Sequence, residues 1–204
     1  SYRGGAVPFT VDPRTREALA DIAAGSGATM FMLTHAVVAA LLRAHGAGDD
    51  IVVGTPVAGR PDAALDRIVG FFVNTLVLRT DLSGDPTVRD LLARVREVDL
   101  DAYAHQDMPF EQLVQDLDIP RDTSRTPIYQ AFFTYQNVSD RAASIGELAY
   151  SQIHVHAPVA MTTLSVSTRS PVSSTTEPLL TLTTSASVRI LPPRSTTARP
   201  RAST

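Results

Sequence analysis

The sequence predicts an α/β fold, with a mixed sheet flanked by helices, and three observations lead to this class. Helical patterns alternate with short apolar strands along residues 1–161. Hydrophobic residues make up 44% of the chain and charged residues 19%, which is enough apolar surface to bury a core. No apolar run approaches the roughly 18 residues of a membrane span. Residues 1–161 are therefore expected to form a layered domain.

The first elements are set by clear start and stop signals. Residues 6–11 predict a short strand, and Asp12-Pro13 then begins a helix, because Asp caps helices and Pro suits the first helical position. That helix is expected to end at Gly25. A second helix runs from Thr29 as its cap to Gly46, with apolar residues at helical spacing and alanines over much of the rest.

The remaining elements follow from the same patterns. The run 71–80 is the strongest strand, because it is nearly continuous in aromatic, β-branched and Leu residues. The other predicted elements are strands at 51–57, 129–136 and 148–155 and helices at 87–104 and 109–117.

The composition changes near residue 161. Residues 162–204 contain one acidic residue, five Arg, five Pro, no aromatic residue, and 20 Ser or Thr among 43 residues. Such a segment has too little apolar surface to offset its ordering entropy, so disorder is expected. Two origins stay open, a natural Ser/Thr/Pro-rich tail and a frameshifted product of a GC-rich gene, which would also fit cations that are all Arg.

Charge and cysteine content exclude several classes of protein. Eighteen basic side chains, all of them Arg, face 21 acidic ones, so no basic excess indicates a nucleic-acid partner. The chain has no Cys, which excludes disulfide scaffolds, thiolate metal sites and Cys nucleophiles. The N-terminus shows no secretory signal, so a cytoplasmic protein without a membrane partner is expected. Because the first residue is Ser, the chain is expected to be a piece of a longer one.

Asn74 is the most conspicuous polar residue of the strong strand. Alternation along a strand places it on the same face as Phe72, Leu76 and Leu78. A carboxamide among such neighbours must be hydrogen-bonded, which leaves two roles open. Asn74 either satisfies backbone groups nearby or lines a substrate channel.

Three further segments carry polar residues in turns. In 105–111 (HQDMPFE), Asp107 is placed to cap the helix that Pro109 begins and Glu111 lies in its first turn, while His105 has no evident nucleophile beside it. In 121–127 (RDTSRTP), two Arg around an Asp are most simply a local ion pair. In 51–60 (IVVGTPVAGR), a strand ends in a Gly/Pro exit and a solvated Arg60.

The histidines give no complete metal or catalytic site. His45 lies at a helix C-terminus, and His35 at the edge of the apolar stripe of the same helix. His154 and His156 share one strand face and would form half a metal site, with no further ligand close in sequence. No metal is expected.

In this order, the segments resemble the C-terminal half of a condensation domain of nonribosomal peptide synthetases. The strings VGFFVNTLVLR, HQDMPFE and RDTSRTPIY look like three successive signature motifs of that family, and GATMFMLTHAVVAALL…DDIVVGTPVAGRPD is similar as well. The resemblance covers residues 2–160. The motif positions are Gly70, Asn74, Arg79, His105, Gln106, Asp107, Pro109, Phe110, Glu111, Arg121, Asp122, Ser124 and Arg125.

The resemblance implies one lobe of a two-lobed fold similar to chloramphenicol acetyltransferase, with a tunnel between the lobes. Family members join a carrier-bound acyl donor to a carrier-bound acceptor amine, in pathways that make peptides such as antibiotics. The implied partners are peptidyl carrier domains with phosphopantetheine arms, an adjacent adenylation domain and the N-terminal lobe. The implied cofactor is only that arm, which belongs to the carriers.

The family motif His-His-x-x-x-Asp-Gly, which positions the amine, belongs to the N-terminal lobe and is absent from this sequence. No catalytic residue is therefore assigned, and the isolated chain is expected to be inactive. By the resemblance, Asn74 is the residue most readily placed in the tunnel wall. Two alternatives stay open, a non-catalytic lobe that binds a carrier or another protein and a fragment of an epimerisation-type relative.

Overall fold

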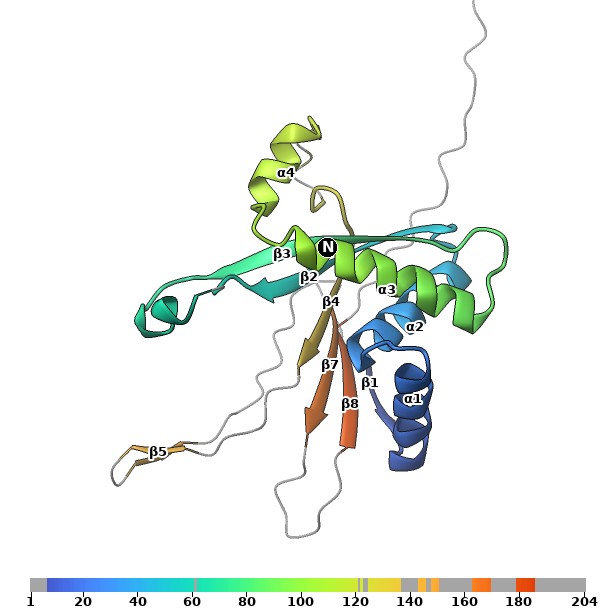
Figure 1. The fold of residues 1–204 in the computed structure, drawn as a ribbon, viewed down its shortest axis with the longest axis horizontal. Coiled ribbons are helices and arrows are strands. Elements are labelled where there is room, and N and C mark those ends of the chain that lie inside the picture. Colours follow the sequence, from blue (N-terminus) through green and yellow to red (C-terminus); the bar gives the residue numbers. More distant parts are fainter. Residues whose placement is uncertain are drawn as a thin grey trace, which may run out of the picture.

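The structure is a computed structural model that describes residues 7–60, 62–120, 122, 125–136, 143–145, 148–150, 163–169 and 179–185. Helices and strands alternate along its first half, as the α/β prediction requires (Figure 1). The elements are β1 (Val7–Val11), α1 (Pro13–Gly25), α2 (Met30–Ala44), β2 (Asp50–Ala58), the 3-10 helix η1 (Ala63–Arg67), β3 (Val73–Asp81), α3 (Val88–Ala104), α4 (Phe110–Asp116), β4 (Ala131–Gln136), β5 (Ala143–Ile145), β6 (Leu148–Tyr150), β7 (Thr163–Arg169) and β8 (Leu179–Ser185).

The main sheet has six described strands in the order β1-β8-β7-β4-β2-β3. β4 runs parallel to both β2 and β7, whereas the pairs β2–β3, β7–β8 and β1–β8 are antiparallel. β5 and β6 form a separate two-stranded ribbon. The predicted mixed sheet flanked by helices is therefore confirmed.

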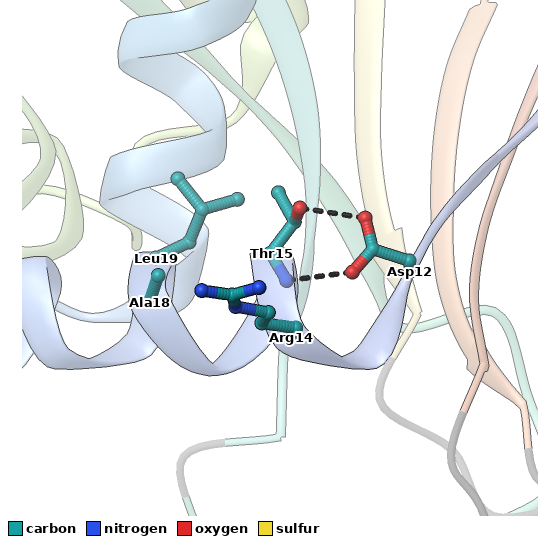
Figure 2. Close-up of a pocket in the computed structure, with 5 residues that line it drawn as sticks. All are labelled: Asp12, Arg14, Thr15, Ala18 and Leu19. Carbon is teal, nitrogen blue, oxygen red and sulfur yellow. Dashed lines mark hydrogen bonds between the residues drawn. The ribbon is translucent and has the colours of Figure 1, made fainter.

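Helices α1, α2 and α3 begin where the sequence predicts. The Asp12 carboxylate accepts a hydrogen bond from the Thr15 backbone N–H at 2.9 Å (Figure 2). Pro13 occupies the first turn of α1. Thr29 caps α2, and Thr87 caps α3 in a reciprocal arrangement with Asp90. Each cap satisfies backbone donors that a helix start leaves without intrahelical partners.

The core lies between one face of the sheet and helices α2 and α3. Alternate residues of β2 and β3 are buried there, because successive side chains of a strand point to opposite faces. Val53, Leu78 and Phe133 have no exposed surface and come from three neighbouring strands. Val95 of α3 and Ala39 of α2 meet them from the helix layer.

The hairpin of β2 and β3 extends beyond the rest of the sheet and has η1 at its far end, while α4 stands apart from the other helices (Figure 1). β4 pairs with β2 only at Val53 and Gly54, so the rest of β2 continues with β3 alone. The motif segments of the sequence lie along this hairpin and at its contact with α4.

The C-terminal part contains two strands where the sequence predicts disorder. The segment 162–204, for which disorder is expected, contains strands β7 and β8, and its other residues lie outside the described ones. β7 is rich in β-branched residues, which fit a pleated sheet. Of the predicted strand 148–155, the structure describes only β6. The origin of the tail, natural or frameshifted, stays a prediction.

No single helix in the described part of the chain is long and apolar enough to cross a membrane. The two that reach this length together, α1 and α2, are bent by 105° relative to each other.

Candidate functional site

Four of the sequence segments meet around the ring of Tyr129. This ring lies directly over Gly54 of β2, where a Cβ atom would come within 2.6 Å of the ring atom Cζ. The Tyr129 phenol lies close to Thr75 of β3, and burial raises the pKa of this phenol. Its ring centroid lies 5.6 Å from that of Phe110 at the start of α4. Residues from all four segments therefore form one junction.

The turn that presents Tyr129 is strained. Ile128 has a φ of 68°, in the left-handed region that a β-branched residue rarely adopts, and the Tyr129 N–H donates to the Pro127 carbonyl at 2.8 Å. Such a conformation costs about 1–3 kcal/mol and persists only where surrounding contacts enforce it. The packing of Tyr129 on Gly54 supplies such contacts.

Asn74 uses its whole side-chain amide in four hydrogen bonds. Its Nδ2 donates to the carbonyls of Gln106 at 2.8 Å and Met108 at 2.7 Å. Its Oδ1 accepts from the N–H groups of Thr75 at 2.8 Å and Phe110 at 3.2 Å. Of the two roles left open for Asn74, these bonds support the satisfaction of nearby backbone groups. The channel role stays a prediction.

The predicted cap of α4 by Asp107 is wrong. The cap position is Pro109, which offers no side-chain hydrogen bond, and the helix begins at Phe110. Asp107 lies two residues too early in the chain, in the turn that follows α3. The first helical N–H is bound instead by Asn74, from a strand 36 residues upstream. A partner this distant in sequence is invisible to a local motif.

The other residues of 105–111 are mostly exposed. His105 ends α3, and its Nδ1 donates to the Asp101 carbonyl at 2.9 Å. Glu111 lies in the first turn of α4, as predicted, where an acidic side chain favours the helix dipole. Gln106 takes part through its carbonyl, which Asn74 binds.

The prediction that the Arg60 side chain is solvated is also wrong. Its guanidinium lies 4.0 Å from the ring centroid of Phe72 and donates to the carbonyls of Leu65 and, at 2.9 Å, Ile68. These contacts tie the loop containing η1 to the hairpin. The Gly59 N–H also donates to the Phe72 carbonyl at 2.5 Å, an approach that a Cβ at Gly59 would block. Arg60 is therefore half-buried and structural.

Two arginines among the motif positions, Arg125 and Arg79, form ion pairs. Arg125 lies 3.0 Å from the Asp122 carboxylate, which confirms the local pair, while Arg121 and Ser124 lie outside the described residues. Arg79 makes two hydrogen bonds, of 2.9 and 2.8 Å, to Asp50 across the β2–β3 hairpin. The Arg79 hydrogen bonds lower the pKa of the Asp50 carboxyl. Gly70 packs closely against the Phe72 ring, because a Cβ atom built on Gly70 would lie 3.1 Å from the ring atom Cε2.

One buried polar group was missed. His35 is fully buried in the core rather than at the edge of the apolar stripe; its Nδ1 lies 2.9 Å from Asp99 Oδ1 and its Nε2 3.4 Å from the Thr80 hydroxyl. Asp99 follows Val95 and Leu92 at helical spacing on the apolar face of α3, and an acidic residue on such a face was the available signal. Asp99, His35 and Thr80 follow one another like the acid, base and hydroxyl of a catalytic triad. All three side chains are fully buried, so no substrate reaches them.

The surface depressions beside α1 lie away from the motif residues. A surface depression beside the start of α1 is lined by Asp12, Arg14, Thr15, Ala18 and Leu19, and contains none of the motif residues (Figure 2). Within the described ranges, no group of three or more His, Asp or Glu side chains is placed to hold a metal ion. His154 and His156 lie outside the described residues.

Comparisons with known proteins identify the family. A family model of the condensation domain matches residues 1–168, and the chain therefore belongs to the condensation domain family. It is 45% identical over 166 residues to a probable non-canonical nonribosomal peptide synthetase, CymA, of Salinispora arenicola, covering 81% of this chain and 2% of that protein. It is 44% identical over 151 residues to a dimodular nonribosomal peptide synthase of Bacillus subtilis, covering 74% of this chain and 6% of that protein.

Solved structures agree on the fold. The X-domain in a complex with OxyB from teicoplanin biosynthesis has a TM-score of 0.74 and 29% identity, over 90% of this chain and 40% of that chain. A four-domain nonribosomal peptide synthetase bound to AMP and glycine has the same TM-score with 22% identity, over 89% of this chain and 15% of that one. The predicted fold class is confirmed, and this chain spans less than half of each protein.

Proposed function

We propose that this chain is the C-terminal lobe of an amide-forming condensation domain in a nonribosomal peptide synthetase. The observation that carries the proposal is the junction around Tyr129, which brings the segments of the family's three signature motifs together in one place. The reaction would join a carrier-bound acyl thioester to the amine of a second carrier-bound substrate. The group that manages the proton of that amine, the His-His-x-x-x-Asp-Gly motif, would come from another part of the polypeptide.

Amide formation needs two large substrates held in near-attack geometry, which is why a second lobe is required. The attacking amine loses a proton as it forms the bond to the thioester carbon, and the thiol of the donor carrier leaves. In this proposal the present lobe contributes a wall, a rigid hairpin and part of the surface for carriers, whose phosphopantetheine arms would enter between the lobes. An adenylation domain would lie in the same synthetase, and Asn74 would lie beside the channel.

Exposed apolar residues on the hairpin support the proposal that another part of the domain covers this surface. We call Ile68, Val69, Phe71 and Val73, which lie between η1 and the start of β3, the hairpin patch. Phe71 is 88% exposed, Val69 is fully exposed, and Ile68 and Val73 are each about half exposed. Several exposed large apolar residues within one short segment are typical of an interface. The other lobe of the domain is the proposed occupant.

A segment graft tests this proposal. The matching segment of the Bacillus subtilis dimodular synthase would be replaced by residues 1–168 of this chain, and its peptide product measured by mass spectrometry. Continued formation of the product is expected. A folded graft that loads its amino acids and forms no peptide would contradict the proposal, and the unmodified synthase is the control.

A second candidate function is a lobe that binds a protein without catalysing a reaction. One observation favours it, namely that the X-domain of similar fold was solved in a complex with OxyB. The two candidates predict different behaviour of the isolated chain. Clean monomeric behaviour of the 204-residue chain favours the binding lobe, whereas aggregation through the hairpin patch favours the enzyme lobe.

A further inference from the structure

Asn74 connects two segments that are far apart in the sequence. Its two donated hydrogen bonds go to the carbonyls of Gln106 and Met108, and its accepted bond from Phe110 reaches the first N–H of α4. Apart from the Tyr129 ring against Phe110, α4 meets the rest of the lobe mainly through β3, and none of its residues is fully buried. The position of this helix therefore depends strongly on one side chain.

The same side chain also closes the open edge of the sheet. β3 is the last strand in the order of described strands, so its outer backbone groups face no neighbour. The Thr75 N–H is bound by Asn74 Oδ1 at 2.8 Å. Thr75 and Pro56 are opposite each other as a non-hydrogen-bonded pair, because hydrogen-bonded pairs alternate along the ladder from Gly59 and Phe72, so the Thr75 N–H points away from β2. At this point the sheet ends on the Asn74 amide and the 106–110 turn.

We propose that Asn74 is a positioning residue, whose amide fastens the 106–110 turn to β3 and so fixes the place of Met108 and α4 on the lobe. Asparagine suits this task because its side chain both donates and accepts. Two carbonyls and two N–H groups surround it, and each is satisfied. An aspartate of the same shape offers no donor when ionised, and an alanine offers neither function.

Hydrogen exchange on the 204-residue chain tests the proposal locally. In Asn74→Ala, the amides of Phe110 and Thr75 are expected to exchange about tenfold faster, because each loses its hydrogen bond. The amides of Val53, Leu78 and Phe133 report the core and are expected to stay unchanged. Arg79→Ala is the matched control, because it removes an exposed pair on the same strand, and it is expected to leave Phe110 unaffected. Unchanged exchange at Phe110 in Asn74→Ala would overturn the proposal.

The variant Asn74→Asp adds a reading that general destabilisation would not produce. An ionised carboxylate faces the Gln106 and Met108 carbonyls without a donor, so the turn is expected to detach at pH 6. Below the ordinary carboxyl pKa of about 3.9, the protonated acid regains one donor. Exchange at Phe110, corrected for intrinsic rates, is therefore expected to slow again at pH 3. No recovery at pH 3 in a folded variant would contradict a role for the donated bonds.

A measurement on the unmodified chain covers the case in which a variant does not fold. Scalar couplings across hydrogen bonds, measured by NMR on labelled protein, are expected between Asn74 Nδ2 and the carbonyl carbons of Gln106 and Met108. Two freely exchanging Nδ2 protons without such couplings would overturn the proposal. These readouts need no carrier and no second lobe.

The consequence for the synthetase rests on the proposed function. In the grafted synthase, Asn74→Ala and Met108→Ala are each expected to lower peptide formation, and the double variant is expected to lower it no further than Asn74→Ala alone. Additive losses would contradict a positioning role through Met108. Failure of the unmodified graft would count against the proposed function and would leave the exchange results as they stand.

Discussion

His35 and Asp99 form a fully buried pair between α2 and α3, with His35 Nδ1 2.9 Å from Asp99 Oδ1. Within the described residues, Asp99 Oδ2 has no hydrogen-bond partner, so the imidazole is the main polar contact of this carboxyl group. The pair joins the two helices that cover the sheet. Breaking one half leaves the other buried without its partner, which costs more than replacing both.

We predict that His35→Ala destabilises the chain by about 3–5 kcal/mol, because Asp99 then stays buried without its partner. The double variant His35→Leu/Asp99→Leu is expected to be more stable than His35→Ala. Urea unfolding followed by circular dichroism measures both. If the loss in the double variant equals the sum of the losses in His35→Leu and in Asp99→Leu, the two side chains do not interact.

Gly54 is predicted to tolerate no side chain while Tyr129 is present. Gly54→Ala places a Cβ within 2.6 Å of the ring and is expected to cost about 1–3 kcal/mol through overpacking. Removing the ring in Tyr129→Ala should make a further Gly54→Ala change nearly neutral. Unfolding midpoints of the four proteins decide this, and an equal effect of Gly54→Ala with and without the ring would contradict the contact.

The Asp50–Arg79 pair predicts a specific loss of stability in acid. The pKa of Asp50 is lowered in the folded chain by its hydrogen bonds to Arg79, so the pair's contribution is complete above the unfolded carboxyl pKa of about 3.9. That contribution is lost as the pH falls through the folded pKa. Thermal unfolding between pH 6 and pH 2.5 is expected to depend less on pH in Asp50→Asn than in the unmodified chain. Parallel curves would contradict the pairing, and 1 M NaCl should weaken it.

The hairpin patch predicts a separation of stability from association. Phe71→Ser is expected to change the unfolding free energy by no more than about 0.5 kcal/mol, because the ring is 88% exposed. It should lower self-association of the isolated chain, measured by sedimentation velocity. Val37→Ser on the exposed face of α2 is the matched control and is expected to leave association unchanged. Equal association of Phe71→Ser and the unmodified chain would exclude the patch as the contact surface.

Local patterns predicted most of the first half of the fold. Asp12, Thr29 and Thr87 begin their helices as expected, because a cap depends on residues within one turn. The errors came from contacts distant in sequence. Asp107 looked like a cap for α4, but Asn74 takes that role; Arg60 looked solvated, but the Phe72 ring covers it.

The candidate site shows the same division between local patterns and contacts distant in sequence. The motif strings indicated which segments matter, and Tyr129 ends the third of them, yet no local pattern predicts that its ring is the point where the segments meet. Gly54 was a usable signal, since a glycine inside a strand often marks the close approach of another group. The burial of His35 with Asp99 depends on the packing of two helices against each other, and the two residues are 64 positions apart in the sequence. Only the three-dimensional arrangement brings them together.

Sequencing the genomic DNA on both sides of this coding region tests the central proposal most directly. The account predicts a His-His-x-x-x-Asp-Gly motif upstream of Ser1, within the same open reading frame. An acidic segment with aromatic residues in another frame after residue 161 would show that the tail is frameshifted. A start codon and promoter directly before Ser1, with no such motif in frame, would contradict the proposal that this chain is one lobe of an amide-forming domain.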